Sequence, residues 1–207
     1  GAQGTLLDID HGTYPFVTSS NPNSGAACVG AGVGPQHINE VLGIIKSYTT
    51  RVGAGPFPTE LNDAIGEEMQ QRGHEYGTVT GRARRCGWMD LAIVNYAIRL
   101  NGITGLALMK LDILDTLPEI KICTGYKLRG EEIPYFPGRL EDLEQVEPIY
   151  ETVPGWQCDT TSCTTFDELP EAAQAFVGRV EALTGVPVKI VAVGPGREQT
   201  IIREHVL

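Results

Sequence analysis

Three arginines stand within four residues of an acidic chain, and they are the strongest chemical signal in the sequence. The segment 77–87 reads Gly-Thr-Val-Thr-Gly-Arg-Ala-Arg-Arg-Cys-Gly, with the guanidinium groups at Arg82, Arg84 and Arg85. A guanidinium binds a carboxylate or a phosphate through parallel hydrogen bonds, and threonine hydroxyls add neutral ones. Glycine lets the backbone close over such a ligand. The segment therefore favours an anion site over the plain alternative, a solvated charged loop.

A second candidate site follows the apolar run 103–109, where the chain continues as Lys110-Leu111-Asp112. Strand ends are where α/β proteins place ligand sites. A carboxylate there can accept hydrogen bonds from both N1–H and the exocyclic N2–H of guanine. The lysine stem can lie along the face of the base. A bare Lys-x-Asp triplet is more often an ion-paired surface turn, so the guanine interpretation depends on its context.

The opening segment carries neutral hydrogen-bonding groups at Gln3 and residues 18–21, which suit a nucleobase and a phosphate. Asp8, Asp10 and His11 are close in sequence and raise the possibility of a metal site. On an extended segment, however, their spacing divides the side chains between two faces. We therefore favour structural hydrogen bonding around a turn over metal binding.

The glycine-rich stretch 193–196 follows an apolar run and is interpreted first as a turn, although it could also let a base or ribose approach the backbone. The sequence has no G-x-x-x-x-G-K-[ST] phosphate loop, no nucleophile elbow, no H-E-x-x-H and no recognisable Cys–His pairing. The remaining motifs do not make a complete catalytic centre.

Composition excludes several classes of protein. The formal net charge of the 207 residues is −10. This charge argues against a general nucleic-acid binder, because neutralising phosphates needs a basic surface. The five cysteines form no C-x-x-C pair, and we interpret them as reduced thiols and not as a disulfide frame or a zinc site. Without a recognisable signal peptide or an apolar run of membrane length, we expect a soluble cytoplasmic protein.

Hydrophobic periodicity predicts alternating helices and strands, which favours an α/β or α+β class. The predicted helices are 36–49, 59–72, 88–100 and 170–184, and the predicted strands are 103–109, 120–126, 186–193 and 199–203. Residues 127–165 contain several prolines and show no clear period, so we expect irregular structure there. The opening Gly-Ala-Gln-Gly turn has no strand ahead of it to aim it, which predicts that the chain is part of a larger protein.

Taken in order, five stretches make the chain resemble the adenylosuccinate synthetase family: 1–21, 50–61, 80–88, 110–112 and 148–156. The resemblance covers essentially all of the chain and corresponds to the C-terminal half of the family's sequence. It implies an α/β fold: part of a P-loop-NTPase-like central sheet plus a C-terminal α+β domain. Residues 1–45 would be the remaining part of the nucleotide-binding core. Residues 46–207 would carry the aspartate loop and the guanine-binding motif.

The resemblance also implies an activity. The family is a ligase that condenses IMP with L-aspartate, driven by GTP hydrolysis with Mg²⁺, to give adenylosuccinate on the route to AMP. The family's catalytic Asp and His, its phosphate loop and its Mg²⁺ ligands would lie in the N-terminal half, and the full enzyme would be a homodimer. We therefore expect this fragment to be inactive alone. The rival interpretations are a non-catalytic purine-nucleotide-binding module or sensor, and a functionless remnant.

Carried over by motif, the resemblance assigns residues to three ligands and none to a catalytic role or a metal. The IMP-binding residues would be Gln3, Thr18, Val52 and Arg82. The aspartate-binding residues would be Thr78, Val79, Thr80, Gly81, Arg82, Ala83 and Arg84. The GTP-binding residues would be Arg84, Lys110, Leu111, Asp112, Ala192, Val193 and Gly194. Val79 stands where the family often has Thr, so one hydroxyl for aspartate would be missing.

Overall fold

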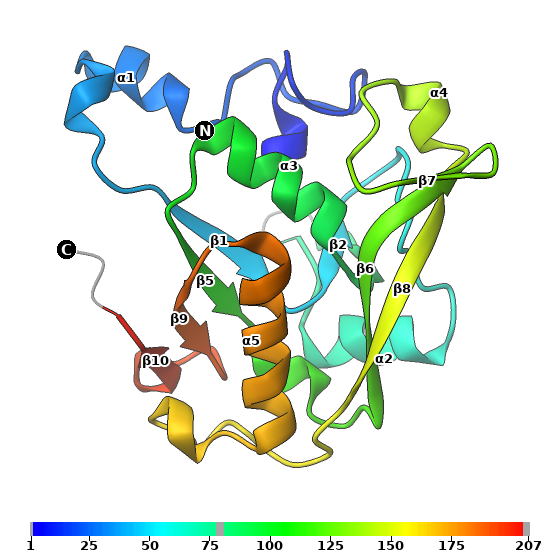
Figure 1. Cartoon of the computed structure of the whole chain (residues 1–207), viewed down its shortest axis with the longest axis vertical. Helices are drawn as coiled ribbons and strands as arrows, with labels where there is room; N and C mark the ends of the chain where they lie inside the picture. Colours follow the sequence, from blue (N-terminus) through cyan, green and yellow to red (C-terminus); the bar gives the residue numbers. More distant parts are fainter. Residues whose placement is uncertain (1, 78–80, 205–207) are drawn as a thin grey trace.

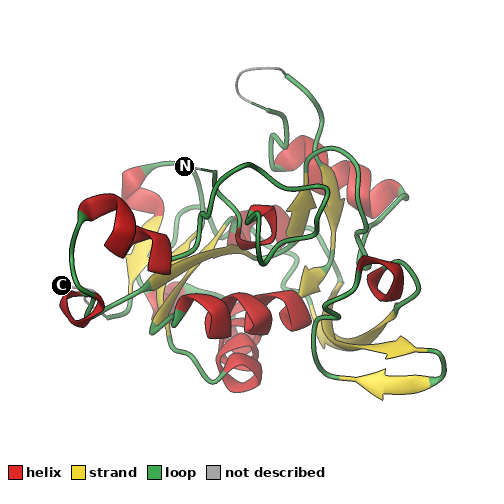
Figure 2. Ribbon diagram, turned by 90° about the horizontal axis from the view of Figure 1, so that it is seen from above, coloured by secondary structure: helices red, strands yellow, loops and turns green. Residues whose placement is uncertain are grey.

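The computed structural model describes residues 2–77 and 81–204 as a mixed α/β structure (Figure 1). Figure 2 shows the strands as separate groups divided by helices and long loops. The central sheet has the strand order β1-β5-β9-β10. Its strands are β1 (Leu42–Lys46), β5 (Gly105–Met109), β9 (Val188–Ala192) and β10 (Thr200–Ile202).

Strand direction in the central sheet determines where its polar residues gather. β5 runs parallel to both β1 and β9, and only β10 is antiparallel to its neighbour. The carboxyl ends of β1, β5 and β9 therefore meet at one edge. Lys46 is paired with Met109 at the ends of β1 and β5, so the residues that follow these strands begin side by side.

Two further sheets lie beside the central one. A two-stranded sheet joins β2 (Thr49–Arg51) to β3 (Arg85–Gly87) in antiparallel fashion. A larger sheet is built on the long strand β6, which pairs parallel with β4 and antiparallel with β7 and β8. Its strands are β4 (Met89–Asp90), β6 (Glu119–Leu128), β7 (Glu131–Ile133) and β8 (Glu147–Pro154).

The helices cover these sheets and complete the core. Leu106, Leu108 and Val191 of the central sheet pack in one buried cluster with Phe176 and Val180 of the longest helix. Figure 1 shows that helix, α5, lying across the strands. The α-helices are α1 (Gly25–Ala31), α2 (Ala64–Arg72), α3 (Leu91–Asn101), α4 (Leu140–Leu143) and α5 (Glu171–Thr184). The 3₁₀ turns are η1 (Thr5–Leu7), η2 (Pro35–His37), η3 (Leu111–Leu114), η4 (Phe166–Glu168) and η5 (Arg197–Gln199).

The predicted helix 36–49 is wrong. Residues 42–46 form β1, residues 49–51 form β2, and only η2 stands near the predicted start. Ile44, Ile45, Thr49 and Thr50 are β-branched, which favours strands over helices. Pairing with β5 and β3 then outweighs the helical spacing of the apolar residues.

Two further helices begin later in the sequence than predicted, and in both an aspartate cap sets the start. The second helix begins at Ala64 because Asp63 caps it, accepting hydrogen bonds from the amides of Ile65 and Gly66 at 3.0 and 3.1 Å. Thr59, the predicted cap, is buried and donates to the Trp88 carbonyl instead. The third helix begins at Leu91, where Asp90 is the cap.

The expectation of irregular structure over 127–165 is wrong for part of that range, since β7, α4 and β8 lie there, whereas residues 155–165 contain no helix or strand. All eight residues of β8 are exposed or only partly buried, so the strand shows no strong apolar alternation and depends on backbone pairing with β6. The predicted strands at 103–109, 120–126, 186–193 and 199–203 and the helix at 170–184 are confirmed with small shifts of their ends.

The mixed α/β class is confirmed, whereas the likeness to a P-loop NTPase sheet stays a prediction. The predicted domain boundary at residue 45 falls inside β1, so residues on both sides of it belong to the central sheet; the division itself stays a prediction. The five cysteines are free thiols. Within 2–77 and 81–204, no helix combines the length and the apolar character that crossing a membrane requires.

Candidate functional site

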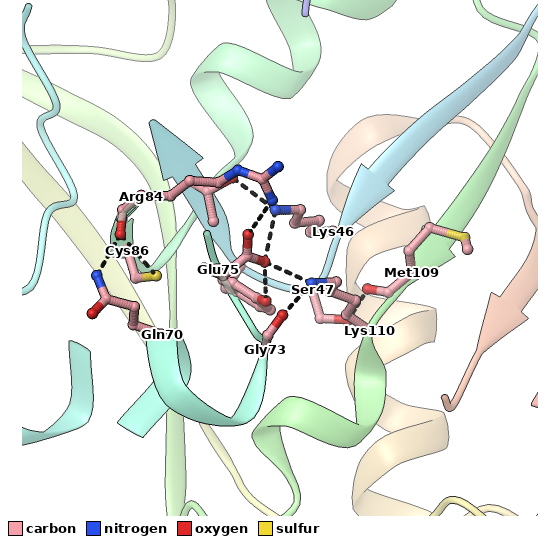
Figure 3. A network of polar contacts seen from close by, with 11 residues as sticks. Lys46, Ser47, Gln70, Gly73, Glu75, Arg84, Cys86, Met109 and Lys110 are labelled. Atoms are coloured by element: carbon pink, nitrogen blue, oxygen red, sulfur yellow. Dashed lines mark hydrogen bonds and ion pairs between the residues drawn. The ribbon is translucent and has the colours of Figure 1, made fainter. Parts of the chain in front are cut away.

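The site is organised around a buried carboxylate, Glu75, just beyond the carboxyl edge of the central sheet (Figure 3). Its side chain is fully buried. Oε1 accepts hydrogen bonds from Lys46 Nζ at 2.8 Å, Lys110 Nζ at 2.8 Å and the Tyr48 hydroxyl at 2.5 Å. Oε2 accepts one from Arg84 Nη1 at 2.7 Å. One carboxylate thus holds three cations that come from separate parts of the sequence.

The strand directions explain why these cations converge. Lys46 is the last residue of β1, and Lys110 directly follows β5. The Ser47 amide donates to the Met109 carbonyl at 2.9 Å, which continues the pairing past the strand ends. Lys110 then takes a left-handed conformation, with φ 62°, and its ammonium also donates to the Gly73 carbonyl at 2.6 Å. Arg84 approaches from the other side, next to β3.

The charges in this cluster do not balance. Burial by itself would raise the pKa of Glu75, but the hydrogen bonds from Lys110, Lys46, Tyr48 and Arg84 outweigh it and lower the pKa to about 2. Burial lowers the pKa of Lys46, and the neighbouring Lys110 and Arg84 charges lower it further against the attraction of Glu75. Three cations therefore share one anion in a chain of net charge −10. This local excess of positive charge suits an anionic ligand.

The arginine segment is a loop whose base is fixed to the same cluster. The Arg84 amide donates to the Glu75 carbonyl at 2.8 Å, and Tyr76 and Ala83 form an antiparallel bridge above it. Gly81 closes the turn, donating to the Gly77 carbonyl at 2.8 Å. Its φ of 62° is a conformation that glycine adopts readily. Arg82 and Ala83 are exposed, while Thr78, Val79 and Thr80 lie outside the described residues.

The third arginine of the segment has a structural role. Arg85 forms a bidentate ion pair with Glu60, with both N–O distances 2.6 Å. It also donates to the carbonyls of Gly53 and Gly55. Arg85 therefore holds the loop that follows Val52 in place.

The predicted guanine-binding triplet presents one unsatisfied acceptor. Oδ1 of Asp112 is buried and has no hydrogen-bond partner among the described residues. Burial raises the pKa of Asp112. Arg72 donates to the Asp112 carbonyl at 2.9 Å and so holds the backbone of the turn. Leu111 is buried in the core, so a ligand could reach only its backbone.

Ala192 is the last residue of β9, the neighbour of β5, and Val193 and Gly194 follow it at the same edge. The side chains of Ala192 and Val193 are buried, and the Val193 amide donates to the Gln199 carbonyl at 2.9 Å. A Cβ at Gly194 would lie 2.3 Å from the end of the Gln199 side chain, so the two residues pack closely in this turn. The turn interpretation of 193–196 is confirmed, and any ligand contact with Ala192 or Val193 would be through backbone atoms.

A cavity of about 600 Å³ lies beside the cluster. Its lining includes Gln3, Val52 and Arg84, three of the predicted site residues, together with Lys46 and Tyr48. Thr18 does not line it, but its amide and hydroxyl donate to the carbonyl of Leu7, which does, at 2.8 and 3.3 Å. Among the described residues, Lys110 and Asp112 lie outside the lining.

The opening segment is held by structural hydrogen bonds, as predicted. Asp8 is buried and accepts hydrogen bonds from the amides of Asp10 and His11 and from the side chains of Asn21 and Asn23, at 2.7–3.1 Å. Burial opposes these bonds, but they lower the pKa of Asp8. In the part of the chain that the structure describes, no three His, Cys, Asp or Glu side chains are grouped to hold a metal ion.

Sequence reasoning missed Glu75, Lys46 and Tyr48. A usable signal was present for Lys46, because it ends the apolar pair Ile44-Ile45 just as Lys110 follows Leu108-Met109. The mistaken helix 36–49 hid this likeness. No comparable signal marks Glu75, whose importance arises only from the three cations that the fold brings to it.

Fold and site together define a mixed α/β protein with a candidate anion site at the carboxyl edge of its central sheet. A family model described as adenylosuccinate synthetase matches residues 1–201. The chain belongs to the adenylosuccinate synthetase family.

Individual relatives agree with this assignment. The chain is 61% identical over 201 residues to an adenylosuccinate synthetase of Heliobacterium modesticaldum, covering 97% of this chain and 47% of the relative. It is 60% identical over 206 residues to one of Desulfitobacterium hafniense, covering 100% and 48%. The chain thus spans about half the length of the curated relatives it matches.

Two solved structures are similar. A fully ligated adenylosuccinate synthetase from Plasmodium falciparum matches with a TM-score of 0.95 and 43% identity, over 99% of this chain and 49% of that one. A cyanophage S-2L succinoaminodeoxyadenylate synthetase, bound to dGMP and dATP as an energy donor, matches with a TM-score of 0.56. Its identity is 19%, over 99% of this chain and 45% of that one, so it supports the fold alone.

Proposed function

We propose that this chain is the substrate-selecting part of an adenylosuccinate synthetase, a ligase that condenses IMP with L-aspartate at the expense of GTP. In this proposal Lys110 and Asp112 select guanine, with the backbone of 192–194 on the other side of the base. Residues 78–84 close on aspartate. Gln3, Thr18, Val52 and Arg82 contact IMP, and Arg84 reaches toward GTP.

The observation that carries the proposal is the unsatisfied Oδ1 of Asp112. A buried polar atom without a partner costs free energy, and a ligand that supplies the missing donor recovers it. Guanine offers N1–H and N2–H on one edge, and a carboxylate accepts both. Asp112 directly follows the Lys110-Leu111 pair at the end of β5, where ligands of α/β sheets gather.

The cluster around Glu75 supports the proposal that the site binds anionic substrates. IMP, aspartate and GTP all carry phosphate or carboxylate groups, and the excess positive charge of Lys46, Arg84 and Lys110 would attract them. Arg84 and Lys46 line the cavity that also contains Gln3 and Val52. A cavity of about 600 Å³ is in the range of ligand pockets.

We further propose that this chain corresponds to the C-terminal half of the family's sequence, and that residues outside it contribute the catalytic Asp and His, the phosphate loop and the Mg²⁺ ligands. Among the described residues, no three His, Cys, Asp or Glu side chains are grouped to hold a metal ion. In the complete protein, Mg²⁺ would offset the negative charge of the GTP phosphates. The complete enzyme is proposed to be a cytoplasmic homodimer.

The test compares two proteins in one assay. Full-length synthetase containing this sequence should form adenylosuccinate from IMP, aspartate and GTP with Mg²⁺, and the 207-residue chain alone should form none. Equilibrium binding of GDP, IDP and ADP to the chain alone would separate a nucleotide-selecting fragment from a functionless remnant. An inactive full-length protein would overturn the synthetase proposal. An active isolated chain would overturn the proposal that the catalytic groups lie outside this chain.

A further inference from the structure

We propose that Glu75 is the positioning residue that ties the guanine-side Lys110 to the aspartate-side Arg84, so that one buried carboxylate aligns two substrate subsites. The inference rests on the proposed function and deepens it, because Glu75 itself has no assigned role. It touches no ligand in this proposal. Its effect passes through the cations that it holds.

The first argument is connectivity. Lys110 and Arg84 lie on different elements, and the contacts of Glu75 join them on its two oxygens, Oε1 to Lys110 and Oε2 to Arg84. Arg84 and Lys46 line the cavity, whereas Lys110 lies outside its lining. Glu75 therefore connects the side chains of the cavity wall to the side chain of Lys110, two residues before Asp112.

The second argument is rigidity. Glu75 is fully buried, and five donors fix it or its backbone: Lys46, Tyr48, Lys110 and the guanidinium and amide of Arg84. A long cationic side chain that is held by a charged hydrogen bond loses little further freedom when a ligand binds. Figure 3 shows Lys46, Arg84 and Lys110 turned inward on Glu75 from three directions.

The third argument is charge. Without the Glu75 carboxylate, three cations would face one another in a half-buried space. Repulsion would then push Lys110 and Arg84 apart and change the spacing of both subsites at once. A residue that served only one ligand would not have this double effect.

The experiment uses full-length synthetase that contains this sequence and measures the KM values for GTP, aspartate and IMP separately. Glu75→Gln keeps the shape of the side chain and removes its charge. The expected result is a rise of about tenfold or more in the KM for both GTP and aspartate, the effect of losing hydrogen bonds to a charged group. The KM for IMP should rise less than these two, because Arg82 is the one proposed IMP residue on the loop that Glu75 holds, whereas Gln3 and Thr18 lie on the opening segment.

The matched control is Glu151→Gln, which removes a carboxylate paired with Arg179 at 2.6 and 2.7 Å on β8 and α5. It should leave all three KM values unchanged. Tyr48→Phe is a second probe, since it removes one hydrogen bond to Glu75 and keeps every charge. It should raise the GTP and aspartate KM values together, by about two- to fivefold.

A folded Glu75→Gln enzyme in which only one of the two KM values rises, or in which the KM for IMP rises equally, would overturn the positioning role. If Glu75→Gln does not fold, Tyr48→Phe decides by the same criterion. A wild-type enzyme that makes no adenylosuccinate would instead remove the proposed function, and this inference with it. An active wild type with an unaffected Glu75→Gln variant would remove this inference alone.

Discussion

Glu75 and Arg84 are joined twice, through the backbone and through the side chains. The Arg84 amide donates to the Glu75 carbonyl at 2.8 Å, and Arg84 Nη1 donates to Glu75 Oε2 at 2.7 Å. The double link closes the base of the loop that contains Gly77 and Gly81. Because Glu75 also holds Lys46 and Lys110, the position of this loop is tied to the carboxyl edge of the central sheet.

The lowered pKa of Glu75, from 4.5 to about 2, predicts a specific loss of stability in acid. A depressed carboxyl pKa adds stability that is fully present above the unfolded-state value and is lost as the pH falls toward the folded-state value. The free energy of unfolding should therefore fall by on the order of 3 kcal/mol between about pH 5 and pH 2 because of this residue. Urea titrations across that range measure it.

A difference between variants isolates this contribution from those of other carboxylates. Glu75→Gln should be less stable than wild type at pH 6, and the gap should narrow as the pH approaches 2. The control Glu151→Gln removes a largely exposed ion pair, which contributes little to stability, so the variant should stay within about 1 kcal/mol of wild type across this range. A constant gap between wild type and Glu75→Gln would mean that the carboxylate does not titrate in this window.

Asp112→Asn should weaken the preference of the full-length enzyme for GTP over ITP. Asp112 has a buried acceptor, Oδ1, without a partner among the described residues. Asparagine has nearly the same shape, but it replaces one of the two acceptor oxygens with an NH₂ donor, which cannot accept a hydrogen bond from guanine. Loss of a hydrogen bond to a charged group costs roughly tenfold or more. The measurement is the ratio of kcat/KM for GTP and ITP. ITP lacks the N2–H donor, so unchanged discrimination would contradict the assignment of Asp112 to guanine.

Sequence patterns predicted best where a short stretch of adjacent residues encodes the burial. Residues 106–109 are all apolar and lie in the central strand β5, and the helical spacing of Ala173, Phe176 and Val180 gives the buried face of α5. The prediction for the residues of β1 was wrong because their local pattern is ambiguous. Its apolar residues fit a helix as well as a strand, and only pairing with β5, more than 60 residues away, decides between them.

The residues of the candidate site also differ in how far the sequence predicts them. Candidate motifs that lie within one backbone turn, such as Lys110–Asp112 and 193–196, can be predicted from adjacent residues. Glu75 cannot, because its chemistry depends on cations at positions 46, 84 and 110 that converge only in the folded chain. Burial of an acidic residue with several partners is a property of the fold and leaves no local pattern.

Truncating Phe176 to alanine should destabilise the protein by about 3–5 kcal/mol, the usual cost of emptying a buried aromatic site. Phe176 is 1% exposed, and its ring contacts that of Trp156, with centroids 6.0 Å apart. Chemical denaturation at neutral pH measures the loss. Truncation of the exposed Tyr135 to alanine is the control and should change stability by less than about 1 kcal/mol. Equal losses of stability from the two truncations would contradict the assignment of Phe176 to the core.

Asp90 should affect stability with the opposite sign to Glu75. Burial raises its pKa from 3.8 to about 6, although hydrogen bonds from Tyr126 and from the amides of Ile93 and Ala92 oppose the shift. The folded protein therefore binds more protons than the unfolded chain between about pH 4 and pH 6, so this residue makes stability fall as the pH rises through that range. The fall should be on the order of 3 kcal/mol.

Asp90→Asn separates this effect from the others, because asparagine keeps an acceptor for the Ile93 amide that starts α3 and carries no charge. The difference in unfolding free energy between Asp90→Asn and wild type should shift in favour of the variant as the pH rises from 4 to 7. Cap loss alone would give a constant offset, and a changed Tyr126 contact would also be independent of pH in this range. A flat difference curve would therefore show that Asp90 does not titrate there, whereas a rising one assigns the stability change to its ionisation.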